Sequence, residues 1–215
     1  MVSMIYIIFI CIVPPLVLML ALIKKEAKLT VGFMVIGIVM CLFAAEINSL
    51  LALIFSEDIF FLTTSVTPIS EEIIKALPIL FFSFIYSDDR KTILSISMAV
   101  GIGFAILENA TILTQNIDSV NITWAIVRGF CAALMHGICT AAVGYGLSFV
   151  KKKKKLFYTG TFGLLTTAII FHATYNALVQ STCPYIGFIL PILVYIPIVI
   201  LIKKQSKKAK IISEK

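Results

Sequence analysis

Charged residues are scarce in this sequence. Only 13% of its 215 residues are charged, whereas 60% are hydrophobic, and the mean hydropathy is +1.06. This balance excludes a soluble domain, which needs many more charged side chains on its surface. It is typical of a polytopic membrane protein. We therefore predict an all-α fold, in which residues 1–215 form a single domain that is a bundle of transmembrane helices in the cell membrane.

The N-terminus lacks the features of a secretory signal peptide. It has no basic segment ahead of its first apolar run, and that run reaches Ile23 without a small-residue cleavage site. We therefore expect residues 2–23 to be retained as a first transmembrane span, bent at Pro14 and Pro15.

Lysine and arginine are absent from three connecting segments, residues 56–65, 115–121 and 181–184. Sixteen of the 18 basic residues fall instead in four short clusters: Lys24, Lys25 and Lys28; Arg90 and Lys91; Lys151 to Lys155; and Lys203, Lys204, Lys207, Lys208, Lys210 and Lys215. Clusters that flank apolar segments favour the anionic headgroups of the lipid bilayer as their partner, and argue against nucleic acid.

The positions of these clusters also predict the topology. Basic loops tend to stay in the cytoplasm. Seven spans place all four clusters on that side, at about residues 2–23, 31–56, 66–86, 92–114, 123–150, 156–180 and 185–202. The N-terminus is then outside and the C-terminus is cytoplasmic.

Common motifs for disulfides and for zinc are absent as well. The five cysteines are scattered without a CxxC pair, and no HExxH pair occurs. We therefore expect neither a disulfide framework nor a zinc knuckle.

The most unusual stretch that is present is residues 67–78, where Glu71, Glu72 and Lys75 stand at the head of an apolar run. A charge at the centre of a bilayer costs about 2.5 to 3.5 kcal/mol, so such residues usually serve a function. Two simpler interpretations stay open. Acidic residues in the first turns of a helix complement its N-terminus, and Glu72 and Lys75 have the spacing of a helical ion pair.

Other predicted spans contribute further polar groups, namely Glu46, Asn48, Glu108, Arg128, His136, His172 and Asn176. If the charged residues among all these were left unpaired, their burial would cost on the order of 15 to 20 kcal/mol. They must therefore pair, take up protons or face water. We predict that five of these residues line one cavity that opens towards the outer face: Glu71, Glu72, Glu108, His136 and His172.

These residues occur in motifs whose order resembles a known family. The motifs are Glu71-Glu72-x-x-Lys75, Gly103-Phe104-Ala105-x-x-Glu108-Asn109, Arg128 with His136, and His172-x-x-x-Asn176. Together they resemble the PrsW family of intramembrane proteases, within a larger group that includes the CAAX prenyl proteases. The resemblance covers about residues 66–180. Residues 24–30 lack the Glu-Pro motif that PrsW proteins often carry there.

The resemblance implies a membrane-embedded protease that cleaves a membrane-anchored protein near the outer face. In this family the expected substrate is an anti-sigma factor, whose site-1 cleavage releases a stress-response sigma factor. Peptide hydrolysis needs an activated water, a group that polarises the carbonyl and a proton for the leaving amine. We expect Glu71 to be the general base and His172 with Asn176 to polarise the carbonyl. Glu72 would hold Lys75 or assist proton transfer.

The remaining two residues, Glu108 and His136, have two interpretations. In one, they orient His172 and the water directly, so that the enzyme is a glutamate-dependent hydrolase. In the other, Glu108, His136 and His172 are the ligands of an open zinc site, which leaves a fourth position for water.

Two other function classes compete with the protease. An ion- or proton-coupled transporter or channel also concentrates glutamate, histidine and lysine in its spans, but it usually shows inverted repeats, and none is visible here. A catalytically silent protein that binds a partner helix is the third possibility.

Overall fold

The computed structural model describes residues 25–55, 58–118 and 121–213, together with Ile5, Ile8, Phe9, Val13 and Leu16. Helices account for 88% of the structure, and no strand occurs in these residues. The prediction of an all-α fold is therefore confirmed. The elements in chain order are α2 (Lys25–Ile54), α3 (Ile59–Phe61), the π-helix η1 (Leu62–Val66), α4 (Thr67–Ile85), α5 (Arg90–Gln115), α6 (Ile122–Leu147), α7 (Lys154–Val179) and α8 (Pro184–Ser213).

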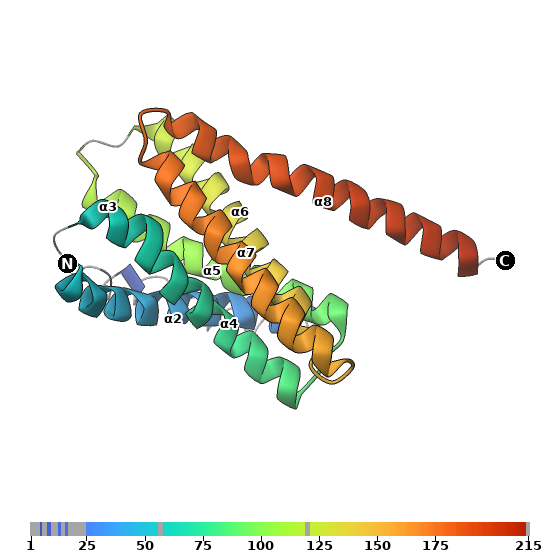
Figure 1. The fold of residues 1–215 in the computed structure, drawn as a ribbon. Helices are drawn as coiled ribbons and strands as arrows, with labels where there is room; N and C mark the ends of the chain where they lie inside the picture. The colour runs from blue at the N-terminus through green and yellow to red at the C-terminus, as the bar shows by residue number, and fades with distance from the viewer. Residues whose placement is uncertain are drawn as a thin grey trace.

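Helices α5 and α6 form the centre of the bundle. Helix α2 packs against α5, α7 packs against α6, and α4 contacts α2, α5, α6 and α7 (Figure 1). Helix α8 contacts α6 and α7, and its C-terminal end projects away from the bundle.

Glycines allow the central helices to approach closely. A Cβ atom at Gly103 of α5 would overlap the backbone carbonyl of Met34 in α2, and one at Gly101 would overlap the backbone carbonyl of His136 in α6. Small residues of this kind let helix backbones pack directly against one another within a membrane. This packing fixes α5 between α2 and α6.

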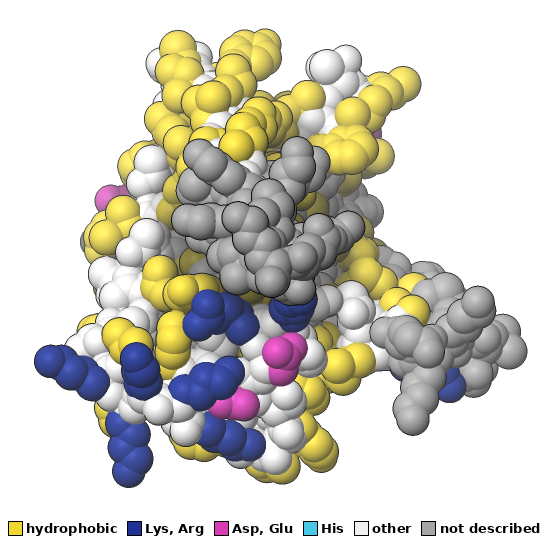
Figure 2. All heavy atoms as spheres, turned by 90° about the vertical axis from the view of Figure 1, so that its right-hand side faces the viewer, with side chains coloured by type: hydrophobic (Ala, Val, Ile, Leu, Met, Phe, Trp, Pro, Cys, Tyr) yellow, Lys and Arg dark blue, Asp and Glu magenta, His cyan; other side chains and the backbone are white. Residues whose placement is uncertain are grey.

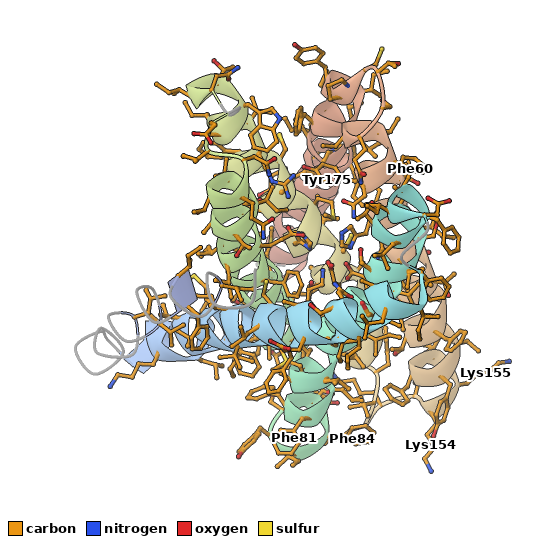
Figure 3. All side chains as sticks on the ribbon, turned by 90° about the vertical axis from the view of Figure 1, so that its left-hand side faces the viewer. Phe60, Phe81, Phe84, Lys154, Lys155 and Tyr175 are labelled. Carbon is orange, nitrogen blue, oxygen red and sulfur yellow. The ribbon has the colours of Figure 1, made fainter. Side chains whose placement is uncertain are left out.

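Alternating helix directions give the bundle two different ends. One end holds the start of α7, with Lys154 and Lys155, and Phe60 and Tyr175 lie in the opposite half of the bundle (Figure 3). Lysine and arginine side chains gather over one end of the molecule (Figure 2). At the basic end, the Asp89 side chain accepts a hydrogen bond from the Thr92 N–H at 2.9 Å and so caps α5. Bonds from the Thr92 backbone and hydroxyl hold the pKa of the Asp89 carboxyl below its usual value.

The described helices support a multi-pass membrane protein but not the predicted count of seven spans. Among the described residues, four helices are long and apolar enough to cross a membrane: Ala27–Ile54, Arg90–Gln115, Ile122–Leu147 and Lys154–Val179. The predicted span 66–86 coincides with α4, which is shorter and carries three charges. The apolar part of α8 is also shorter, at Pro184–Pro197. The predicted span 2–23 lies almost entirely outside the described residues.

One segment that we expected to be an outer loop is helical. Within residues 56–65, Asp58 caps α3 by accepting a hydrogen bond from the Phe61 N–H at 2.8 Å. Helix η1 then runs directly into α4, since the Thr67 N–H donates to the Leu62 carbonyl five residues earlier. This arrangement places Thr63 beside the start of α4.

Candidate active site

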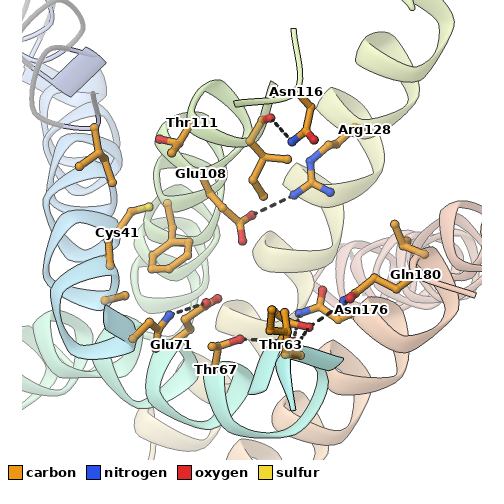
Figure 4. A pocket seen from close by; sticks show the side chains of 18 of the residues that line it. Cys41, Thr63, Thr67, Glu71, Glu108, Thr111, Asn116, Arg128, Asn176 and Gln180 are labelled. Atoms are coloured by element: carbon orange, nitrogen blue, oxygen red, sulfur yellow. Dashed lines mark hydrogen bonds and ion pairs between the residues drawn. The ribbon is translucent and has the colours of Figure 1, made fainter. Parts of the chain in front are cut away.

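A cavity of about 910 Å³ lies at the end of the bundle where α5 ends and α6 begins (Figure 4). Its rim includes the exposed side chains of Asn116 and Gln180, and its base includes buried Glu71. Glu108 of α5 and Arg128 of α6 also line the cavity. The cavity therefore connects the solvent-exposed rim with carboxylates inside the bundle.

Glu71 is held by a neighbour on α2. The Asn48 Nδ2 atom donates to Glu71 Oε1 at 3.1 Å, and the Ser70 hydroxyl donates to Asn48 Oδ1 at 2.6 Å. The other oxygen, Glu71 Oε2, lies 3.7 Å from His172 Nε2. Both of these atoms are buried, and neither has a hydrogen-bond partner among the described residues.

Glu72 points into the bundle and is the anchor of a buried polar network. Its Oε1 atom accepts from Lys75 Nζ at 2.6 Å and from His172 Nδ1 at 2.8 Å. Lys75 has no exposed side-chain surface, and its Nζ atom also lies 2.8 Å from His136 Nδ1. Three helices, α4, α6 and α7, thus meet at one ammonium group and one carboxylate.

The network continues to the cavity through His136. Its Nε2 atom lies 3.0 Å from Glu108 Oε2, and Arg128 Nη2 approaches the same oxygen at 3.8 Å. Glu108 is 22% exposed, so the network ends at the wall of the cavity.

The partners of each ring fix the histidine tautomers. An ammonium group only donates hydrogen bonds, so His136 Nδ1 accepts from Lys75 and the ring proton is on Nε2, facing Glu108. An ionised carboxylate only accepts, so His172 donates from Nδ1 to Glu72. The Nε2 atom of His172 therefore presents a lone pair towards Glu71.

The comparison with known families decides the affiliation of the chain. The model of the PrsW family intramembrane metalloproteases matches residues 25–202, which include every residue of the polar network. The chain belongs to this family. Neither a curated protein nor a solved structure matches it.

Family membership makes this PrsW protein a membrane-embedded endopeptidase, and its substrate a membrane protein. The transporter alternative is not favoured by this match. The predicted resemblance to the PrsW family is confirmed.

The five predicted cavity residues form one connected cluster. Glu71 and Glu108 line the cavity. Glu72, His136 and His172 are at most 1% exposed, and they adjoin Glu71 and Glu108 from the interior, at the base of the cavity. The charge on Lys75 draws Glu72 and His136 into the interior as its partners.

Three of these side chains converge closely enough that they could hold a metal ion. One ligand atom each of Glu71, His136 and His172 lies within 4.8 Å of the others. This set differs from the predicted one, because Glu71 takes the place of Glu108. Two nitrogens and one carboxylate oxygen are a donor set that zinc accepts in open catalytic sites. Glu71 Oε2 and His172 Nε2 have no hydrogen-bond partner in the described residues, so they are available to bind such an ion. The Glu72 carboxylate accepts from His172 Nδ1, which is the outer hydrogen bond that a metal-binding histidine usually makes.

Three further polar residues near the cavity have side-chain or backbone partners in this PrsW protein: Asn176, Arg128 and Asn48. Asn176 lines the cavity and donates from Nδ2 to the Thr63 carbonyl at 3.0 Å. Arg128 is buried next to Glu108, with its guanidinium 5.6 Å from the centre of the Trp124 ring. Asn48 of α2 orients Glu71.

We expect Lys75→Met to destabilise the protein by about 3 to 5 kcal/mol, because it leaves the buried Glu72 carboxylate without its cation. Thermal unfolding in detergent measures this, with a thiol-reactive dye reporting the exposure of buried cysteines such as Cys139. The matched control is Lys152→Met, which removes the exposed ion pair with Asp88 at 3.5 Å and should change stability by less than about 1 kcal/mol. Equal losses for both variants would contradict a structural role for the buried pair.

Proposed function

We propose that this protein makes a site-1 cleavage in a membrane-anchored anti-sigma factor, close to the outer face of the membrane, and so releases a stress-response sigma factor. The catalytic part of this proposal rests on two buried atoms without a hydrogen-bond partner in the described residues. These are Glu71 Oε2 and His172 Nε2, which lie 3.7 Å apart at the base of the cavity. The anti-sigma factor is inferred from the family resemblance.

In this proposal Glu71 activates the water. Asn48 holds Glu71 Oε1, so Oε2 is left to take a proton from a water whose oxygen attacks the scissile carbonyl. The tetrahedral intermediate then collapses, the C–N bond breaks, and the proton on Glu71 passes to the leaving amine. His172, held by Glu72, lies beside this position and would polarise the carbonyl oxygen when its Nε2 carries a proton as well. Asn176, one turn further along α7, lines the cavity next to it.

We further propose that the enzyme uses zinc. The residues that would hold the ion are His136, His172 and Glu71, with the Glu108 carboxylate next to His136 as a second source of oxygen. With zinc bound, Glu71 Oε2 would be a ligand, and Glu71 would no longer be the group that activates the water. A bound zinc ion would lower the pKa of water and polarise the carbonyl. His136 would bind the ion as a neutral ring, so its ligating nitrogen would give up its present contact, with Lys75 at Nδ1 or with Glu108 at Nε2.

Glu71→Gln should abolish cleavage while the protein still inserts and folds, since an amide has nearly the same shape but does not accept the proton. The measurement is cleavage of a co-expressed membrane-anchored anti-sigma factor, detected by immunoblot. Asp118→Asn is the control, because Asp118 is an exposed acidic residue outside the cavity. A Glu71→Gln protein that still cleaves would mean that another group is the base.

Treatment of the purified enzyme with a strong chelator should remove the activity, and stoichiometric zinc should restore it. Elemental analysis provides a readout that is independent of activity, with zinc bound to the wild type and lost from His172→Ala. Full activity with no bound metal would instead support the glutamate-only mechanism.

The orientation that we propose has the N-terminus outside and the C-terminus in the cytoplasm, because the cavity and the Lys151–Lys155 cluster lie at opposite ends of the bundle. Cys183 is exposed beyond the end of α7. A membrane-impermeant maleimide should label it in intact cells. In a Cys183→Ser background, a new cysteine at Lys153 should react only after the cells are opened. The reverse pattern would overturn this orientation.

A further inference from the structure

One face of α7 leads from the base of the cavity to its rim. His172, Asn176 and Gln180 follow each other at four-residue steps. His172 is fully buried next to Glu71, whereas Asn176 and Gln180 line the cavity and Gln180 is exposed. Four residues of an α-helix rise by about 6 Å, so these side chains form a ladder with rungs about 6 Å apart.

The two amides of this ladder are oriented by Thr63 of η1. Asn176 Nδ2 donates to the Thr63 carbonyl at 3.0 Å, and Gln180 Oε1 lies 3.1 Å from the Thr63 hydroxyl, whose single proton also has the Ile59 carbonyl as an acceptor at 2.9 Å. A carbonyl accepts only, so Asn176 is fixed with Oδ1 on its other side. Each of these two amides has further hydrogen-bonding atoms beyond its contact with Thr63. Both amides line the cavity, so these atoms are available to a ligand there.

A peptide that is cleaved here must be extended. In a helix each carbonyl is already bonded to an N–H four residues later, which shields the bond that has to be attacked. An extended strand rises by about 3.3 Å per residue, so backbone groups that face the same way recur every two residues, about 6.6 Å apart. This repeat is close to the spacing of the ladder.

We propose that Gln180 is a substrate-binding residue that pairs with the backbone of an extended substrate segment. With the scissile bond at His172, Asn176 meets the backbone about two residues away and Gln180 meets it about four residues away, on the side that leads to the rim. The contacts are to backbone groups, so the site selects an unwound stretch next to the membrane with little preference for its side chains on this side. This inference rests on the proposed protease function.

The test uses a library of internally quenched peptides in detergent with the purified enzyme. On a peptide that the wild type cleaves, Gln180→Ala should raise KM by about fivefold, the equivalent of one neutral hydrogen bond, and leave kcat unchanged. Gln115→Ala is the matched control, because Gln115 ends α5 at the same end of the bundle but does not line the cavity.

Replacing single peptide bonds of that peptide by trans-alkene isosteres, which lack both the carbonyl and the N–H, locates the contact. An isostere about four residues from the scissile bond, on one side only, should raise KM for the wild type by a similar factor and have no further effect on Gln180→Ala. An unchanged KM for Gln180→Ala, or an isostere penalty that persists in it, overturns the role of Gln180 and leaves the protease function intact. If the wild type cleaves no peptide in the library and no membrane-anchored substrate in cells, the proposed function fails, and the role of Gln180 fails with it.

Discussion

The contact between Lys75 and Glu72 is the interaction on which the site depends. Lys75 has no exposed side-chain surface, and two such charges in an apolar bundle are tolerated only as a well-made pair with further hydrogen bonds. Those further bonds come from His136 and His172, which belong to α6 and α7. The charge pair therefore ties three helices together. It also sets which nitrogen of each imidazole carries the proton, so one interaction fixes both the packing and the chemistry of the rings.

The adjacent glutamates divide two tasks between them because of helix geometry. Successive residues of an α-helix point about 100° apart, so when Glu72 faces the interior, Glu71 faces the cavity. Glu72 is bonded to a lysine and a histidine and serves to hold them. Glu71 has one oxygen bound to Asn48 and the other unpaired. A carboxylate that holds the buried network is thus followed directly in the chain by one that lines the cavity and keeps an unpaired oxygen.

The sequence was sufficient to predict that these residues meet, because charges in apolar spans need partners. It did not predict which of them face the cavity, since that depends on the rotation of α4 that Lys75 imposes. The same rotation of α4 places Glu71 close to His136 and His172, the two other residues that could hold a metal ion. The helical residues 59–66 were missed because their start depends on a single cap by Asp58 and their continuation on a π-turn. Gln180 did carry a signal, the same four-residue step that links His172 and Asn176.

The two sides of the cavity differ in a way that suits a chain passing from lipid into water. On the α2 side its wall includes small or apolar side chains such as Cys41 and Ala44, with Phe104 of α5 beside them. On the α7 side the wall includes the amides of Asn176 and Gln180 together with Val179, and the carboxylate of Glu108 lies between the two sides (Figure 4). Hydrolysis requires water at a carbonyl that the bilayer would otherwise keep dry and helical. A cavity with one apolar wall and one hydrogen-bonding wall meets this requirement. The amides replace the backbone hydrogen bonds that the substrate helix loses when it unwinds. The apolar wall covers the apolar side chains of the substrate as they leave the lipid.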